Sequence, residues 1–193
     1  MTFAFVAAVA AGCGGGDDGA GTPAAPLAAG QTRTLREKDF TTAVPRGWHQ
    51  RKVRRERERV YFLNSGRGHA NDLGLAAPGE VGLTIARQRA PGGQSALTAI
   101  ETIVATPDDA VGVTRSGPIK AASLGGADAA TTQFTYTLGG ATYIQSNLVA
   151  VKDDTLIFIE VDVEPLRAAD GLQVMATVTR NWRWRGGEPS VAS

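Results

Sequence analysis

The stretch from Ala129 to Val163 reads AATTQFTYTL-GG-ATYIQSNLVAV-KDD-TLIFIEVDV and decides the fold. Three runs rich in β-branched and aromatic residues are separated by two short breaks, Gly139-Gly140 and Lys152-Asp153-Asp154. Such runs, with turn-forming residues between them, are typical of β-strands joined by tight turns. The stretch therefore predicts a three-stranded antiparallel meander around which the rest of the chain packs.

The third run of this meander is apolar on both sides. Residues 157, 159, 161 and 163 are Ile, Ile, Val and Val, and Leu156 and Phe158 begin the opposite side. A strand of this kind is typical of one that is covered on both faces, so we expect it at the centre of the sheet. Glu160 and Asp162 continue the second side. Carboxylates two apart on a strand could bind calcium or act in acid–base chemistry, but we favour the ordinary alternative, in which they face solvent or pair with arginines.

Two amphipathic helices are predicted outside the meander. Ser95 is a suitable N-cap for a helix that faces the core through Leu97, Ile100 and Val104. The last helix is expected from about Ala168 to Asn181, with an apolar stripe made of Leu172, Met175, Val178 and Trp182. With strands expected near Phe40, Val60 and Val81, the fold class is α+β. It is an α/β/α sandwich with a central, mainly antiparallel sheet.

The composition of the chain limits the classes of function that it can have. The 193 residues carry a net charge of +1 and 42% apolar residues, which suits one globular domain with terminal extensions and does not call for nucleic acid as a partner. The single cysteine, Cys13, excludes an intrachain disulfide.

The N-terminus has the character of an export signal. Phe3 to Ala11 is apolar, too short to span a membrane and the right length for a signal-peptide core of about 7 to 15 residues. The sequence Ala10-Ala11-Gly12-Cys13, followed by Gly and Asp, resembles the lipobox of bacterial lipoproteins. The resemblance implies a signal peptide over residues 1–12 and an acylated Cys13 (diacylglycerol and palmitate). The alternative is an unmodified structural cysteine in an apolar N-terminal helix.

The remaining domain boundaries follow from composition. Residues 13–36 are rich in Gly, Ala and Pro and are expected to form a flexible tether. A folded domain is expected over residues 37–186, followed by a polar tail over residues 187–193.

A basic segment is the candidate surface for a ligand or partner. Residues 51–59 read RKVRRERER, and strand-like alternation would put Arg55, Arg57 and Arg59 on one side. Anionic headgroups, phosphate polymers or an acidic partner would suit such a segment. The alternative is a solvated hairpin or edge strand that its charges protect from aggregation. With two residues of the following loop, the candidate surface comprises Arg51, Lys52, Arg54, Arg55, Arg57, Arg59, Arg67 and His69.

No catalytic or metal-binding set is predicted. The two histidines, His49 and His69, lie in turn-like surroundings, and Gly66 and Gly68 do not extend to a nucleotide-binding GxGxxG pattern. We therefore expect no catalytic residues, no metal and no cofactor.

The order of elements resembles the PsbP-like fold (the Mog, PsbP, DcrB and LpqN type). The resemblance runs from about Glu37 to Arg185, and its marker residues are Phe40, Pro45, Gly47 and Trp48, the strand at 157–163 and the closure at 172–184. It implies an α/β/α sandwich and, through bacterial envelope lipoproteins of this fold, a location in the cell envelope. Proteins of this fold mostly act as accessory or partner-binding proteins.

Together these features predict a non-enzymatic protein held by a lipid anchor on the extracytoplasmic side of the cell membrane. Its expected partners are the membrane, through the anchor, and another envelope protein or an anionic lipid or polymer, but not nucleic acid. Two alternatives stay open: a Ser/His hydrolase using His49 or His69, and a passive structural envelope lipoprotein with no binding surface.

Overall fold

The computed structural model describes residues 24–55, 58–66, 77–105, 114–115 and 117–185. The strands within these ranges are β1 (Thr32–Arg36), β2 (Phe40–Pro45), β3 (His49–Arg55), β4 (Glu58–Asn64), β5 (Val81–Arg89), β6 (Thr114–Arg115), β7 (Lys120–Leu124), β8 (Ala127–Leu138), β9 (Ala141–Lys152), β10 (Thr155–Val163) and β11 (Arg183–Trp184). The helices are α1 (Ala96–Ala105) and α2 (Ala168–Arg180), with short 3-10 turns η1 (Ala29–Gln31) and η2 (Pro165–Arg167). Cys13, the expected signal peptide and the tail at 187–193 lie outside the described residues.

A large antiparallel sheet forms the middle of the molecule, in the order β3-β4-β5-β10-β9-β8-β6, with β7 also paired to β8. The predicted meander is confirmed as β8, β9 and β10, and β10 pairs along its full length with β5 on one side and β9 on the other. Gly139 and Gly140 both have positive φ (60° and 84°), the backbone conformation that a two-residue hairpin turn requires. The turn therefore sets the register of β8 against β9.

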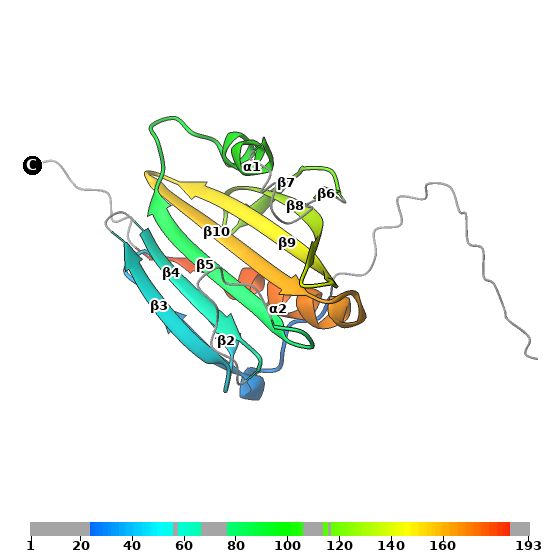
Figure 1. The fold of residues 1–193 in the computed structure, drawn as a ribbon. Helices are drawn as coiled ribbons and strands as arrows, with labels where there is room; N and C mark the ends of the chain where they lie inside the picture. Colours follow the sequence, from blue (N-terminus) through cyan, green and yellow to red (C-terminus); the bar gives the residue numbers. More distant parts are fainter. Residues whose placement is uncertain (1–23, 56–57, 67–76, 106–113, 116, 186–193) are drawn as a thin grey trace, which may run out of the picture.

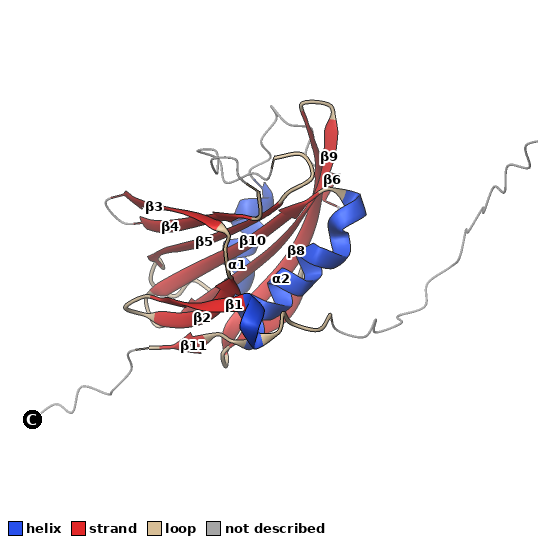
Figure 2. Ribbon diagram, turned by 90° about the horizontal axis from the view of Figure 1, so that it is seen from below, coloured by secondary structure: helices blue, strands red, loops and turns tan. Residues whose placement is uncertain are grey.

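One face of the large sheet, here the helix-2 face, is covered by α2 together with a small sheet of order β1-β2-β11. Figure 2 shows α2 and this small sheet on the same side of the large sheet. The main core lies between them, and its largest fully buried side chains include Trp182, Tyr61, Phe40, Leu83, Ile85, Ile157 and Ile159. Burying this apolar surface is the main stabilisation of the fold.

The opposite face, here the helix-1 face, is only partly covered by a helix. Helix α1 packs against β8 and β9 through Ala96, Ala99 and Ile100, which meet Val149 and Leu156 of the sheet. In Figure 1, which looks onto this face, neither of the two described helices lies over β5. The α/β/α sandwich is confirmed, but the layer on this side is incomplete among the described residues.

Both helices begin or end near the predicted residues, and their buried faces match the prediction at Ile100, Val178 and Trp182 but not at every residue. The Ser95 hydroxyl caps α1 by accepting from the Thr98 amide (3.0 Å), whereas Leu97 is 49% exposed and Leu172 of α2 is 52% exposed. Val178 and Trp182 of the predicted stripe are buried and Met175 packs against the core, and Gly171 and Val174 join them in place of Leu172. A Cβ at residue 171 would lie 3.0 Å from Val163, so the missing side chain lets this turn approach β10 closely.

The folded domain begins before the expected boundary at residue 37. Strand β1 pairs with β2 over residues 32–36, and Leu35 is buried in the main core. Further upstream, the Leu27 amide donates to Thr177 Oγ1 of α2 (2.8 Å). The expectation of a flexible tether reaching residue 36 is therefore wrong from Leu27 onward.

The C-terminal tryptophans close the core. Trp182 is fully buried and stacks on Phe40 with ring centres 4.2 Å apart, and the Trp184 indole donates to the Leu124 carbonyl oxygen (2.7 Å). The described part of the chain contains no helix that is long and apolar enough to cross a membrane.

Candidate functional site: a basic corner and a buried carboxyl pair

The basic segment forms a hairpin at one edge of the large sheet. Strand β3 is the edge strand, and its Arg54 pairs with Arg59 of β4. Because the chain reverses between these strands, Arg59 shares its side with Lys52 and Arg54. The expectation that Arg55, Arg57 and Arg59 share one side of a single strand is wrong, and the edge-hairpin alternative describes this segment.

The turn between β1 and β2 folds onto this hairpin and brings two carboxylates to it. Glu37 accepts from Lys52 Nζ (2.6 Å) and Arg59 Nη1 (3.1 Å). Asp39 pairs with Arg87 Nε of β5 (2.8 Å). Arg185, just after β11, donates to the Glu37 carbonyl oxygen (3.1 Å).

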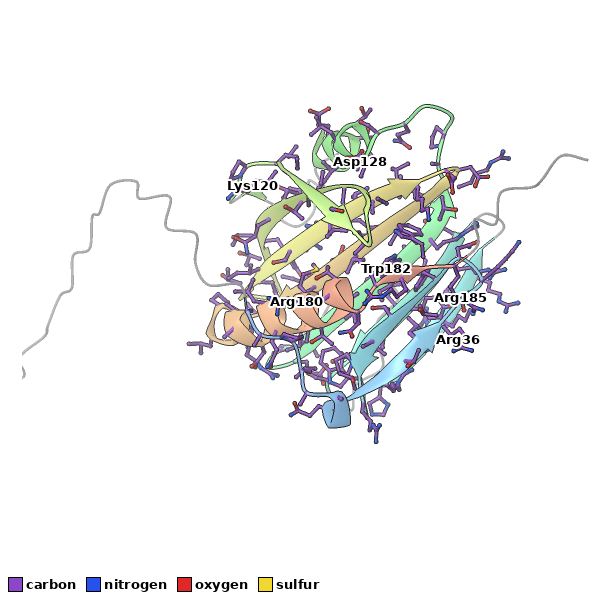
Figure 3. The ribbon with its side chains drawn as sticks, turned by 180° about the vertical axis from the view of Figure 1, so that it is seen from behind. Arg36, Lys120, Asp128, Arg180, Trp182 and Arg185 are labelled. Carbon is purple, nitrogen blue, oxygen red and sulfur yellow. The ribbon has the colours of Figure 1, made fainter. Side chains whose placement is uncertain are left out.

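We call this surface the basic corner, and it gathers cations from four separate segments of the chain. Its cationic members are Arg36, Lys38, Lys52, Arg54, Arg59, Arg87 and Arg185, and its carboxylates are Glu37 and Asp39. Figure 3 labels Arg36 and Arg185 at this corner, away from Arg180 and Lys120. Positive charge therefore exceeds negative charge in the cluster.

Glu37 is held in its charged form by its neighbours. Burial raises the pKa of Glu37, but hydrogen bonds from Lys52 and Arg59 outweigh it and lower that pKa below its usual value. The same hydrogen bond to Glu37 raises the pKa of Lys52. By contrast, the side chains of Arg36, Lys38 and Arg54 are exposed and form no hydrogen bond or ion pair with the described residues. These three cations are available to an external anion.

The other residues of the predicted surface do not join this corner. Arg51 lies on the helix-1 face, with its guanidinium 5.9 Å from the centre of the Phe62 ring. Arg57, Arg67, His69 and the side chain of Arg55 lie outside the described residues. His49 is exposed on the edge strand, and no serine or carboxylate of the described ranges is hydrogen-bonded to it.

A polar cleft opens beside the basic corner. It has a volume of about 770 Å³ and is lined by Arg87 and Arg89 of β5, the segment that follows them, and Asp153 and Asp154 of the β9–β10 turn. Arg89 and Asp154 approach to 3.5 Å. Since both signs of charge line this cleft, it extends the polar surface of the corner but adds no further positive excess.

On the other face of the sheet, Glu160 and Asp162 form a buried carboxyl pair. Glu160 is 9% exposed and Asp162 is fully buried, so the expectation that they face solvent or pair with arginines is wrong. Asp162 Oδ1 accepts from the Tyr136 hydroxyl (3.0 Å), and the Tyr136 ring stacks on Tyr143 with ring centres 5.2 Å apart. Asp162 Oδ2 has no hydrogen-bond partner among the described residues.

Burial dominates the protonation of this pair. Burial raises the pKa of Asp162 to about 6, although hydrogen bonds with Glu160, Tyr136 and Gln145 lower it. Burial and then the negative charge of Asp162 raise the pKa of Glu160 well above its usual value. Two adjacent carboxyl groups in a dry site cannot both ionise cheaply, so at neutral pH the pair retains a proton or needs an external cation. Within the described ranges there is no cluster of three or more His, Cys, Asp or Glu residues suited to a metal ion.

Several residues of both sites carry no signal in the linear sequence. Arg36, Arg87 and Arg185 are far apart along the chain and meet only through the pairing of β1, β5 and β11 with their neighbours. The burial of Glu160 likewise depends on which segments cover the helix-1 face. The alternation that places Glu160 and Asp162 opposite Ile159 and Val161 was the one available signal for the pair.

Comparison with known proteins identifies the fold. No family model matches the chain, and no curated protein matches it by sequence. Among solved structures, the PsbP protein of the cyanobacterium Synechocystis sp. PCC 6803 (CyanoP) is 13% identical with a TM-score of 0.55, covering 88% of this chain and 98% of its own. A point mutant of Mog1 is 12% identical with a TM-score of 0.51, covering 79% and 95%. LpqN of Mycobacterium tuberculosis, described as involved in cell envelope biogenesis, is 13% identical with a TM-score of 0.46, covering 86% and 88%. The chain has a PsbP-like fold.

Proposed function

We propose that this protein is a non-catalytic, lipid-anchored protein of the cell envelope whose basic corner binds an anionic, phosphate-bearing ligand. The observation that supports this most is the gathering of cations from four separate segments into one exposed cluster. Among the described residues only two carboxylates, Glu37 and Asp39, lie in the cluster, and both are already paired. Arg36, Lys38 and Arg54 carry the uncompensated charge.

Arginine is well suited to this task. Its planar guanidinium presents a fork of N–H donors that matches two oxygens of a phosphate, and its charge persists at all physiological pH values. Near an anionic membrane surface each Lys or Arg contributes about 1 kcal/mol of attraction. Three free cations would therefore contribute about 3 kcal/mol, which is weak for a soluble ligand but useful to a domain already held at a surface.

The proposed anchor at Cys13 would supply that proximity. About ten residues separate Cys13 from the start of the described chain at residue 24, and at most about 3.5 Å per residue they could extend roughly 40 Å. The anchored domain would thus explore only a thin layer next to the headgroups. A high local concentration of anionic groups would compensate for weak intrinsic affinity.

The two alternatives are less well supported. A Ser/His hydrolase using His49 would need a serine and an orienting carboxylate beside that histidine, and no described residue takes those roles. A passive structural lipoprotein would not require a cluster of exposed, uncompensated cations on one corner.

Vesicle binding tests the proposed ligand chemistry. The soluble form of the chain, with Cys13→Ser, is sedimented with phosphatidylglycerol vesicles, with phosphatidylcholine vesicles and with soluble polyphosphate as a competitor. We expect binding to the anionic vesicles alone and its displacement by polyphosphate. Equal binding to both vesicle types, or to neither, would contradict the proposal. Binding that polyphosphate fails to displace would assign the site to the lipid headgroup rather than to phosphate in general.

Cell fractionation tests the anchor independently. We expect the unmodified chain in the membrane fraction and the Cys13→Ser variant in the soluble fraction. A Cys13→Ser variant that stays in the membrane fraction after a high-salt wash would show that the anchor hypothesis is wrong, whatever the vesicle experiment gives.

A further inference from the structure

The outer edge of β3 offers main-chain hydrogen-bonding groups to a partner. Strand β3 is the last strand of the large sheet, and no described strand pairs with its outer side (Figure 1). In an antiparallel pair, alternate residues of a strand turn their N–H and C=O groups toward the neighbour and away from it. Because β3 has seven residues, three or four of them present these groups outward. The edge is therefore a template for one further strand.

Most of the devices that protect a sheet edge are absent from the described part of β3. Proteins protect an edge with a short strand, a bulge, a proline, a covering segment or charge. The register of β3 against β4 runs without a bulge from end to end, and the strand contains no proline. Residues 49–54 are exposed except for Val53, and Gln50, Lys52 and Arg54 make no main-chain hydrogen bond beyond the pairing with β4. Charge is the one device left on this edge within the described residues.

The other strand edges in the described ranges are shorter than the edge of β3. Strands β1 and β7 have five residues each, and β6 and β11 have two each. When a peptide adds to a sheet as a strand, its affinity comes mainly from main-chain hydrogen bonds, and their number grows with the length of the edge. Strand β3 can therefore form the longest such ladder.

The charge of β3 decides which kind of strand can pair with it. The strand reads HQRKVRR, with four Lys or Arg residues and no carboxylate. If two copies of the chain paired antiparallel about Val53, Lys52 of one copy would lie opposite Arg54 of the other, and like charges directly opposite each other are destabilising. A segment with carboxylates on alternate residues would form opposite-charge pairs instead. The edge therefore disfavours a second copy and favours an acidic strand.

We propose that the outer edge of β3 binds an extended acidic peptide segment of a partner protein as an additional strand of the large sheet. Carboxylates on one side of the segment pair with Lys52 and Arg54, and the main-chain ladder holds the segment in register. On the other side, an apolar residue next to Val53 extends the small apolar cluster that Val53 forms with Val60 and Phe62. This binding goes beyond the proposed recognition of phosphate, because it requires the backbone of β3.

Calorimetric titration of the full chain, in its Cys13→Ser form, with three capped synthetic peptides tests the proposal. The peptide EVEVEVE has the expected charge and strand propensity, KVKVKVK has the opposite charge, and EPEPEPE has the same carboxylates without the strand. Proline lacks an N–H group and fixes φ, so EPEPEPE cannot form a ladder with β3. We expect EVEVEVE to bind at least about tenfold more tightly than either control. Equal binding of EPEPEPE, or no binding of millimolar EVEVEVE, would overturn the proposal.

Amide hydrogen exchange locates the bound peptide on the chain. In the free protein, the amides of residues 49–55 that face away from β4 should exchange rapidly, because they have no main-chain partner. Saturating EVEVEVE should slow the exchange of these amides and leave that of β1 unchanged. Protection of another segment without protection of residues 49–55 would overturn the assignment to this edge.

Matched variants separate the edge from the basic corner and from net charge. Arg54→Glu, on β3, is expected to weaken EVEVEVE binding about tenfold, whereas Arg180→Glu, the same change at the exposed end of α2, should leave it within about threefold. Arg36→Gln removes a cation of the basic corner outside β3, so it should weaken vesicle binding and leave peptide binding within about threefold. Equal weakening by Arg54→Glu and Arg180→Glu would overturn the proposal. Loss of vesicle binding alone would contradict only the proposed function.

Discussion

At the scale of single residues, the buried carboxyl pair makes the stability of the fold depend on pH. Asp162 has a pKa raised to about 6 by burial, and the pKa of Glu160 is raised well above its usual value by burial and by Asp162. In the unfolded chain both groups titrate near pH 4. Between those pH values the folded protein holds protons that the unfolded chain releases, so stability falls as pH rises through this window.

Removing both charges should flatten this pH dependence. In the Glu160→Gln/Asp162→Asn variant, the free energy of unfolding relative to that of the unmodified chain should increase from pH 5 to pH 8, by about 1.4 kcal/mol from Asp162 alone. Urea unfolding at pH 5, 6, 7 and 8 measures it, with Asp153→Asn as the exposed control. A stability difference that does not vary with pH would show that the pair is not the titrating group.

The sequence could place these residues on one side of β10 but could not predict their burial. Alternation along Leu156–Val163 assigns the side of each residue, because the period of a strand is two. Whether one side of the strand is exposed to solvent depends on other segments of the chain. Thr84 and Asn147 flank Glu160 only because of the register of β5 and β9. Local patterns contain no information on that register.

At the scale of elements, the most consequential difference from expectation is β1. Its composition resembles a linker, yet Leu35 is 5% exposed and packs in the main core. The propensity of a single short strand is weak, and its pairing with β2 and the burial of one leucine outweigh it. Low apolar content alone is therefore insufficient to assign a segment to a tether.

A single substitution tests whether β1 is part of the folded domain. Leu35→Ala should lower the free energy of unfolding by about 2 to 5 kcal/mol, because it leaves a cavity in the main core. Thr34→Ala, one residue away on the exposed side of the same strand, should change it by less than about 0.5 kcal/mol. Urea unfolding measures both changes. Similar free energies of unfolding for the two variants would show that this segment belongs to the tether and not to the folded domain.

Helix patterns predicted the existence and approximate ends of α1 and α2, but only part of their buried faces. The large apolar residues Leu97 and Leu172 are exposed, while Gly171 is buried against Val163. Close approach of a helix to a sheet favours small residues at the contact, so the largest residue of a helix need not mark its core face. Hydrophobicity alone could not distinguish these cases.

At the scale of the whole molecule, the fold follows from the meander, and the two sites follow from topology. The meander at 127–163 and the closing tryptophans are local features, and the sequence predicts them well. The basic corner requires the β1–β2 turn, β3–β4, β5 and the residue after β11 to meet, which is a property of the complete fold. The opposite charge of the two sites follows only from that assembly.

Two exposed cations of the basic corner can be compared with two exposed cations elsewhere. Arg36→Gln/Arg54→Gln removes two charges at the corner, and Lys120→Gln/Arg180→Gln removes two charges away from it. The net charge changes equally, and none of the four side chains has an ion-pair partner among the described residues. The comparison therefore separates a specific site from the general effect of net charge.

The most direct test of the proposed function is the affinity of these two variants for phosphatidylglycerol vesicles, measured by sedimentation at low and at physiological salt. At about 1 kcal/mol for each charge, the corner variant should bind about thirtyfold more weakly than the unmodified chain, with a shallower dependence on salt. The control variant should bind within about threefold of the unmodified chain. Equal losses in the two variants, or no loss in the corner variant, would contradict the assignment of anionic binding to the basic corner.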